Sequence, residues 1–392
     1  MELKTLVWAP GEGWSASVAA LADLDGPRTL VLAFAASELV DAPAPLHELA
    51  RTFPRSVIMG CSTAGEIRGD LVGDGSVSVA VARFARARLS PVHALASGGA
   101  YAAGRSIAEQ LGGAGDSAGD STAELRGVFV LSDGLAVNGS DLARGLSAGL
   151  APGVTITGGL AADGSRFART WVLVDGEPVE GAISAVGLAG AGLTVGHGTG
   201  GGWEIFGPER TVTRAEGNVL YELDGKPALA LYKTYLGERA SGLPATALLF
   251  PLAVRSAHSA AAALVRTVLA VDEADQSMTF AGDIPEGGRA QLMHAGFERL
   301  VHGAHAAAAA VERGGEGPTL AVGISCVGRR LALGERVEEE LEAVTAALPA
   351  GAEVVGFYSY GEISPFGFSS CELHNQTMTV TTLREAEGAA GS

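Results

Sequence analysis

The stretch Gly60-Cys61-Ser62-Thr63-Ala64-Gly65-Glu66-Ile67 recurs in the same frame as Gly356-Phe357-Tyr358-Ser359-Tyr360-Gly361-Glu362-Ile363. Each copy follows an apolar run, Val57-Ile58-Met59 in the first case and Val354-Val355 in the second. Each places a glycine at the end of that run, a second glycine five residues later, and then Glu-Ile. Glycine-containing loops after buried strands allow positive φ angles and close backbone approach, which ligand sites use. The repetition predicts a fold built by duplication, with both Gly-loops facing one cleft.

Three segments share the order strand, helix, strand and Gly-loop. Their first strands are predicted at residues 29–34, 127–131 and 320–324, and their second strands begin at Val57, Val154 and Val354. A further strand follows each unit, at residues 77–84, 182–188 and 377–382. Short apolar strands that alternate with helices indicate an α/β fold with mixed β-sheets flanked by helices.

The chain of 392 residues is long enough for two to three domains. We predict two, at residues 1–215 and 216–384, followed by a disordered tail at residues 385–392. A flexible loop is predicted at residues 112–120, where glycines and small polar residues cluster. A long Ala-rich helix is predicted over residues 286–313.

Composition excludes several classes of protein. An apolar content of 47% supports a folded globular protein. The net charge of −17 makes nucleic acids and anionic membranes poor partners. The three cysteines lie far apart without a Cys-x-x-Cys pair, so neither a disulfide framework nor a zinc knuckle is indicated. Because no signal peptide or bilayer-spanning stretch is visible, we expect a cytoplasmic protein without membrane insertion.

Two groups of polar residues are candidates for a binding site. Glu66 and Glu362 occupy equivalent places in the two copies, where a carboxylate either accepts hydrogen bonds from loop N–H groups or grips an amine across a cleft. His374 lies in Cys371-Glu372-Leu373-His374-Asn375-Gln376-Thr377, at the entrance to the last predicted strand. It either provides a metal ligand or ligand contact, or satisfies backbone groups of the loop.

At these motifs the chain resembles FIST proteins, a prokaryotic sensory family with an N-terminal and a C-terminal FIST domain. Residues 57–67 resemble the first hallmark of the N domain, and Glu222-Leu223-Asp224-Gly225-Lys226-Pro227-Ala228 resembles the start of the C domain. Further matching motifs are Ser132-Asp133-Gly134, Gly158-Gly159, Asp163, residues 282–287 and residues 373–377.

The resemblance implies a bacterial ligand-sensing and signal-transduction module that is not an enzyme. Since no kinase, cyclase or DNA-binding segment is recognisable, we expect it to act on a separate partner such as a histidine kinase. The residues that we expect at the ligand are Gly60, Cys61, Ser62, Thr63, Gly65, Glu66, Asp133, Gly158, Gly159, Tyr358, Tyr360, Glu362 and Asn375.

Three hypotheses about chemistry remain open at this stage. The first is a haem-based sensor of nitric oxide, with His374 as axial ligand and the Cys61 or Cys371 thiolate as alternatives. The second is a sensor of amino acids or related metabolites, in which Glu66 or Glu362 pairs with an amine and loop N–H groups hold a carboxylate. The third is an enzyme that uses Cys61 as nucleophile.

Overall fold

The chain contains three units of the same topology, as the sequence predicted. The computed structural model describes residues 1–113, 124–257, 263–312, 317–366 and 370–386. The units comprise β3 (Thr29–Ala36), α1 (Ala44–Thr52), β4 (Val57–Thr63) and β7 (Val77–Arg83); β9 (Leu125–Ser132), α3 (Gly139–Gly149), β10 (Thr155–Leu160) and β13 (Ala182–Ala189); and β24 (Thr319–Cys326), α6 (Val327–Leu333), α7 (Glu338–Ala347), β25 (Ala352–Ser359) and β28 (Met378–Glu385). In every unit the first two strands are parallel and the last is antiparallel to the first.

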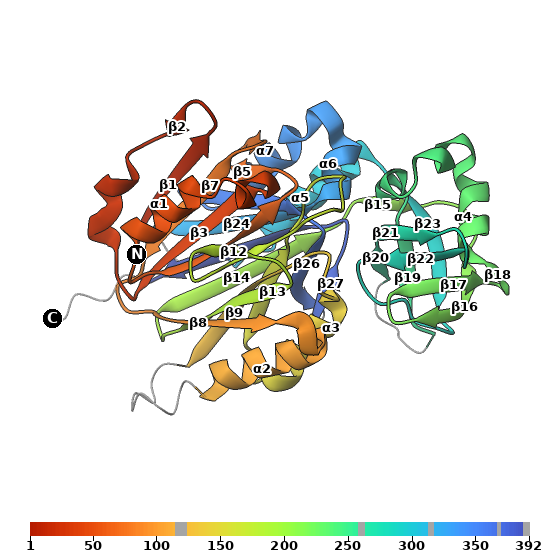
Figure 1. The fold of residues 1–392 in the computed structure, drawn as a ribbon, viewed down its shortest axis with the longest axis horizontal. Helices are drawn as coiled ribbons and strands as arrows, with labels where there is room; N and C mark the ends of the chain where they lie inside the picture. Colours follow the sequence, from red (N-terminus) through yellow and green to blue (C-terminus); the bar gives the residue numbers. More distant parts are fainter. Residues whose placement is uncertain (114–123, 258–262, 313–316, 367–369, 387–392) are drawn as a thin grey trace.

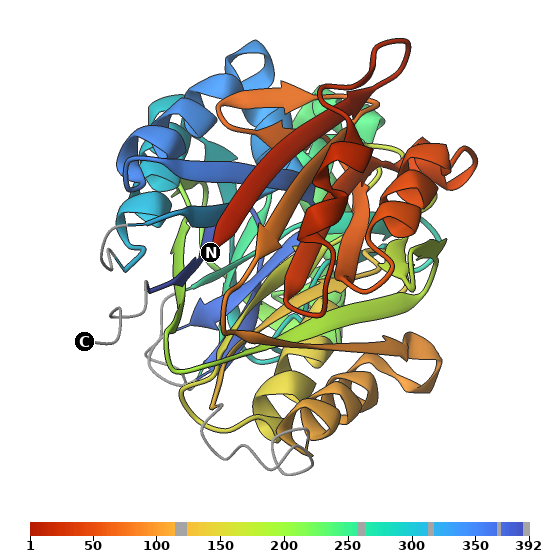
Figure 2. The ribbon, with the colours of Figure 1, turned by 90° about the vertical axis from the view of Figure 1, so that its left-hand side faces the viewer.

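Each unit forms the centre of its own mixed sheet (Figures 1 and 2). The strand orders are β12-β11-β4-β3-β7-β1-β2, β27-β26-β10-β9-β13-β8 and β14-β28-β24-β25-β5-β6. The additional strands are β1 (Glu2–Ala9), β2 (Gly13–Trp14), β5 (Glu66–Arg68), β6 (Leu71–Gly73), β8 (Arg88–Leu95), β11 (Val172–Val174), β12 (Glu177–Val179), β14 (Leu193–Gly200), β26 (Gly361–Phe366) and β27 (Ser370–His374). The α/β fold class is therefore confirmed.

The sheets join segments that are far apart in the sequence. β5 pairs with β25, and β26 pairs with β10. Strands from residues 1–215 and from residues 216–384 thus share two sheets, and residue 215 itself lies within β16 (Arg210–Glu216).

A fourth, nine-stranded sheet forms a smaller module at the right of Figure 1. Its elements are β15 (Trp203–Ile205), β16, β17 (Val219–Leu223), β18 (Lys226–Pro227), α4 (Ala228–Leu236), β19 (Leu252–Arg255), β20 (Leu264–Arg266), β21 (Val268–Asp272), β22 (Ser277–Phe280) and β23 (Arg289–Ala295). The 3₁₀ helices η5 (Gly237–Gly242) and η6 (Ala245–Leu249) also belong to it, and η1 (Val18–Leu24), η2 (Ser37–Val40), η3 (Ala96–Gly98) and η7 (Gly334–Arg336) lie outside it.

The inner faces of the three unit sheets share one hydrophobic core. Along β3, Leu32 and Phe34 enter this core, whereas Val31 and Ala33 pack on the opposite face with α1, as strand geometry requires. The Phe34 and Phe357 rings, from different sheets, stack with centroids 4.8 Å apart. Helices cover the outer faces, with α2 (Ala100–Gly113) beside α3 and α5 (Phe297–Ala309) beside α7 (Figure 1).

The glycines that we expected in loops lie inside strands. Gly60, Gly158 and Gly356 occupy β4, β10 and β25, and the chain turns several residues later. A Cβ atom at these positions would lie 2.1, 1.8 and 1.8 Å from the carbonyl oxygens of Ala33, Val130 and Gly323, respectively. The Gly-loop prediction was therefore wrong. These positions require glycine because the neighbouring strand leaves no room for a Cβ atom, and not because the chain turns there.

Two further predictions need correction. The helix expected at residues 286–313 is instead β23, which pairs with β19, followed by α5, which begins only after Gly296. Residue 385, where we expected the disordered tail to begin, lies in a strand: Glu385 ends β28, and its carboxylate accepts hydrogen bonds from the N–H groups of Ala85, Arg86 and Ala87. Residues 387–392, and residues 114–120 of the predicted loop, lie outside the described residues. Across the described ranges, no helix combines the length and apolarity needed to cross a membrane.

Replacing Phe357 by Ala should destabilise the whole molecule. The ring is fully buried where the sheets meet, and removing a buried phenylalanine side chain costs about 3–5 kcal/mol. We expect this loss in the free energy of unfolding measured by urea titration, against about 0.5 kcal/mol or less for Leu95→Ala, whose side chain is 61% exposed on β8. Equal effects of the two substitutions would contradict a shared central core.

Candidate ligand-binding site

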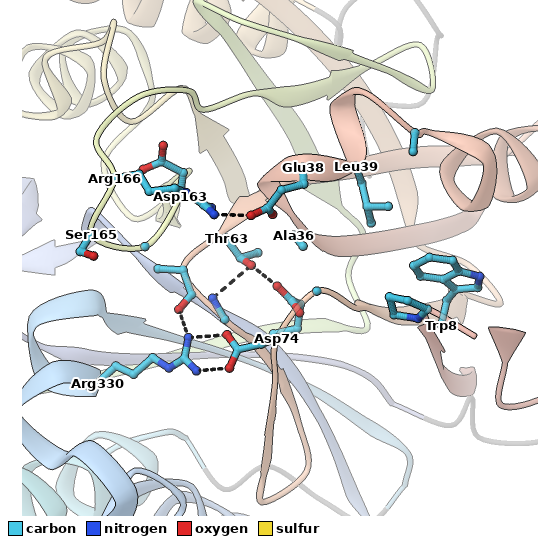
Figure 3. A pocket seen from close by; sticks show the side chains of 17 residues that line it. Trp8, Ala36, Glu38, Leu39, Thr63, Asp74, Asp163, Ser165, Arg166 and Arg330 are labelled. Carbon is cyan, nitrogen blue, oxygen red and sulfur yellow. Dashed lines mark hydrogen bonds and ion pairs between the residues drawn. The ribbon is translucent and has the colours of Figure 1, made fainter. Parts of the chain in front are cut away.

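A cavity of about 580 Å³ opens at the carboxyl ends of β3 and β4 (Figure 3). All three units contribute to its lining. The first unit provides Ala36 at the end of β3, Glu38 in η2, and residues 63–66 from the end of β4 onward. The second unit provides the loop at residues 163–166, and the third provides Arg330 from α6. Carboxyl ends of parallel strands are the usual ligand position in α/β folds.

Arg330 is one of two arginines that line this cavity, together with Arg166. Its Nη1 and Nη2 donate to Asp74 Oδ1 at 2.9 Å and Oδ2 at 2.6 Å, and Nη1 also donates to the Ala64 carbonyl oxygen. The guanidinium lies 5.6 Å from the centroid of the Tyr358 ring. Its side chain is 23% exposed, whereas that of Asp74 is 74% exposed. Gly65 is required here, since a Cβ atom would lie 2.5 Å from Arg330 Nη1 and its φ is +131°.

The Glu66 carboxylate is buried at the wall of the cavity and is held by its own turn. Thr63 Oγ1 donates to Oε1, while the Ser76 N–H and Oγ donate to Oε2 at 3.0 and 2.6 Å. Burial raises the pKa of Glu66 to about 7, although the hydrogen bonds from Ser76 and Thr63 lower it. This carboxyl group therefore titrates near neutral pH.

The second unit contributes a loop that Asp163 organises. Its carboxylate accepts hydrogen bonds from the N–H groups of Phe167, Ala168 and Arg169, at 3.0, 2.8 and 2.8 Å, and from the Tyr360 hydroxyl. The rings of Phe167 and Tyr360 stack with centroids 4.9 Å apart.

Beyond Asp163, this loop presents Arg166 to the other side of the cavity. Arg166 forms an ion pair with Glu38 and donates to Ser37 Oγ at 2.6 Å (Figure 3). The second unit is thereby connected directly to η2 of the first.

The repeated phrase builds the same carboxyl cluster a second time, around Glu362. Ser359 Oγ donates to Oε1 at 2.6 Å, and the Thr377 N–H and Oγ1 donate to Oε2 at 3.1 and 2.8 Å. Burial raises the pKa of Glu362 to about 8, against the hydrogen bonds from Ser359 and Thr377. The two clusters therefore match donor for donor.

Only the first cluster opens to the cavity. Glu362 is fully buried. The nearby Gln376 donates from Nε2 to the backbone carbonyl of Leu248 at 2.9 Å, and the backbone carbonyl of Gln376 accepts from Trp203 Nε1 at 3.0 Å. Leu248 and Trp203 belong to the smaller module, which thus covers the second cluster. Glu66 and Glu362 do not face each other across one cleft.

Apart from Asp133, the predicted site residues divide into three groups. Thr63, Gly65 and Glu66 line the cavity. A second group is buried in the strands or next to their ends and does not line the cavity. Its members are Gly60, Cys61, Ser62, Gly158, Gly159, Tyr358 and Tyr360. Glu362, His374 and Asn375 belong to the covered cluster.

Asp133 has a structural role. It follows β9, and its carboxylate accepts from the N–H groups of Leu135 and Ala136 at 2.8 Å each, from Thr170 Oγ1 at 2.8 Å and from the Gly181 N–H at 2.9 Å. It does not line the cavity.

The surroundings of His374 do not fit haem. The side chain is 6% exposed, its ring packs against Phe366, and Nε2 lies 3.3 Å from the Ser364 carbonyl oxygen. Because a carbonyl only accepts, Nε2 carries the proton, and the lone pair is on Nδ1 of an almost fully buried ring. Burial and the charge of Arg266 lower the pKa of His374 to about 4, so the ring is neutral.

The alternative thiolate ligands are equally enclosed. Cys61 and Cys371 are buried, and burial raises the pKa of both thiols. In the described part of the chain, no group of three or more His, Cys, Asp or Glu side chains could hold a metal ion.

Sequence reasoning missed the charged groups that surround the cavity. Arg330 and Asp74 lie 256 positions apart, and Arg166 and Glu38 lie 128 apart. Trp8, at the opposite end of the cavity from Arg330, was also missed (Figure 3). The one available signal was the Arg329-Arg330 pair directly after the third predicted strand, where the carboxyl end of a strand predicts a ligand position.

Three comparisons place the chain among known proteins. A family model described as the FIST N domain matches residues 29–226, and one described as the FIST C domain matches residues 228–365. An uncharacterized protein of Methanocaldococcus jannaschii is 39% identical over 85 residues, which are 22% of this chain and 16% of that protein's length. A crystal structure of chorismatase aligns with 98% of each chain at a TM-score of 0.38 and 12% identity, and we draw nothing from so distant a likeness.

Glu362→Gln should make stability less dependent on pH. Burial raises the pKa of Glu362 in the folded state to about 8 from 4.5, so the folded state binds more protons than the unfolded chain between these values. Stability that is present at low pH is therefore lost as pH rises through this window, on the order of a few kcal/mol. Glu66, whose pKa is raised to about 7, contributes to the same fall, so in urea titrations at pH 5 to 8 we expect the neutral amide at position 362 to reduce the fall and leave the part that Glu66 contributes. The exposed Glu342→Gln should keep the wild-type dependence, and a fall as steep in Glu362→Gln as in wild type would refute the assignment.

Haemin should bind neither stoichiometrically nor through His374. We expect titration of the purified protein with haemin to give a Soret band that is the same for wild type and His374→Ala, because Nε2 is already engaged with Ser364. A stoichiometric shifted Soret band that His374→Ala abolishes would restore the haem hypothesis.

Proposed function

This chain belongs to the FIST family, whose domains are sensory domains of signal transduction that bind small ligands, and on that premise we propose that it senses a small zwitterionic metabolite such as an amino acid. The ligand binds in the cavity at the ends of β3 and β4. The observation that carries the proposal is the presence of Arg330 and the titratable Glu66 carboxyl in one cavity of about 580 Å³. That volume is in the range of small-molecule sites.

The ligand carboxylate is assigned to Arg330. A guanidinium binds a carboxylate through two parallel hydrogen bonds, and Arg330 makes such a pair with Asp74. Asp74 is 74% exposed and lies on the turn between β6 and β7, so the ion pair that it contributes is weak. A ligand carboxylate can therefore replace Asp74 at low cost.

The ligand amine is assigned to Glu66, which lines the same cavity as Arg330. An ammonium group favours the ionised form of a carboxyl, and Glu66 is partly protonated near its pKa of about 7. Affinity should therefore rise with pH from 6 to 8. An apolar ligand side chain would extend towards Leu39 and Trp8, at the end of the cavity opposite Arg330 (Figure 3).

We further propose that the chain signals to a separate protein, such as a histidine kinase, and does not act as an enzyme. In support of a non-catalytic role, the Cys61 thiol is fully buried and its pKa is raised by burial, which disfavours the thiolate that a nucleophile needs. We do not propose haem as a cofactor, because the His374 ring and the cysteine thiols are buried.

Arg330→Gln should weaken binding of the amino acid by about tenfold to a hundredfold, because hydrogen bonds to a charged group contribute about 1.5–3 kcal/mol. The measurement is isothermal titration calorimetry with the amino acid that gives the largest thermal stabilisation in a panel of natural amino acids. Asp74→Asn should bind more tightly than wild type, since the internal competitor loses its charge.

Arg289→Gln is the matched control, because Arg289 is exposed on β23 and contacts Thr211 and Glu209 outside the cavity. It should bind as wild type does. Stabilisation by no amino acid, or equal affinities of Arg330→Gln and wild type, would reject the proposed ligand class.

A further inference from the structure

A second concave surface, which we term the α6 groove, lies where α6 and the start of α5 meet the smaller module. It has a volume of about 550 Å³, and its lining includes Phe206, Phe250, Phe297, Leu331, Arg239 and His294. Leu331 belongs to α6, Phe297 begins α5, and the other four belong to the module.

The groove exposes large apolar side chains. Phe206, Phe297 and Leu331 are 46%, 45% and 44% exposed, and Ile205, next to Phe206 in the chain, is 59% exposed. Elsewhere in the described residues, large hydrophobic side chains with comparable exposure are scattered. Clustered exposed apolar side chains mark an interaction surface, whereas single ones are ordinary.

The charge of the groove is opposite to that of the chain. Its lining residues, all of them described, include Arg239 and His294 but no Asp or Glu, although the net charge of the chain is −17. Arg239 lies 5.4 Å from the centroid of the Phe250 ring, and it has no ion pair with a described residue. An acidic, apolar partner therefore complements this surface.

We propose that the α6 groove binds an amphipathic helix of a partner protein, with apolar side chains between Phe206, Phe297 and Leu331 and acidic side chains facing Arg239. An apolar groove with charge on its edge suits a helix whose apolar residues recur at helical spacing. This inference rests on the proposed sensory function, for which it provides the output surface.

The position of Leu331 links the groove to the ligand cavity. Arg330 and Leu331 are consecutive residues of α6, and they line the cavity and the groove, respectively. The preceding Arg329 anchors the helix through buried bonds to Glu340 and to the Leu300 carbonyl oxygen. One short, anchored helix therefore contributes to both surfaces, so a ligand that moves Arg330 acts on the element that meets the partner.

The test uses two fluorescent helical peptides of about 18 residues with the same Leu stripe. One carries Glu and the other Lys on its polar face, and binding to the full chain is measured by fluorescence anisotropy. We expect the Glu peptide to bind at least about tenfold more tightly. Arg239→Glu should reverse this preference, and Leu331→Asp should weaken Glu-peptide binding by about tenfold or more. Leu95→Asp is the control, since Leu95 is exposed on β8, and it should bind as wild type does.

Three results would overturn the proposal. They are equal binding of the two peptides, wild-type binding by Leu331→Asp, and a dimer in sedimentation velocity that Leu331→Asp dissociates, which would make a second copy the occupant. Titration of Leu331→Asp with amino acids separates this inference from the proposed function, since this variant should lose the peptide and keep the amino acid.

If the wild-type chain binds the Glu peptide but no amino acid, only the proposed ligand class is rejected. If it binds an amino acid but not the Glu peptide, only the groove assignment is rejected.

Discussion

The structure depends on the packing of three unit sheets around one core, in which the stacked rings of Phe34 and Phe357 join two of them. Because every unit buries the same face of its sheet, the carboxyl ends of the second strands converge. Backbone hydrogen bonds then join these ends: Ala162 N–H donates to the Ser62 carbonyl, and Ala64 N–H donates to the Tyr358 carbonyl. A cavity lined by all three units follows from this convergence.

Duplication produced two chemically equal carboxyl clusters, and their different surroundings separate their roles. Glu66 and Glu362 accept the same pattern of hydroxyl and N–H donors, and burial raises the pKa of both. The smaller module covers Glu362 through contacts of Leu248 and Trp203 with Gln376. Glu66 instead borders the open cavity. The same motif is therefore covered in one copy and borders a cavity in the other, where we propose that the ligand binds.

Charge is distributed so that α6 connects two different surfaces. Arg330 meets the acidic groups of the cavity, and Leu331 contributes to a groove with basic and apolar lining. Arg329, the residue before Arg330, forms a buried ion pair with Glu340, and low dielectric makes breaking such a pair costly. This pair fixes the helix on which both the proposed ligand site and the proposed partner surface depend.

The sequence by itself determined the three strand–helix–strand units, since apolar periodicity is local and survives without knowledge of the fold. It also identified the turn that contains Thr63, Gly65 and Glu66. It misassigned Gly60 to a loop. Both a loop and the close approach of a neighbouring strand, here at Ala33, favour glycine, so the sequence does not distinguish them. Only the tertiary structure brought Arg330 to Asp74 and covered Glu362, because such contacts join side chains hundreds of residues apart and depend on how the sheets pack.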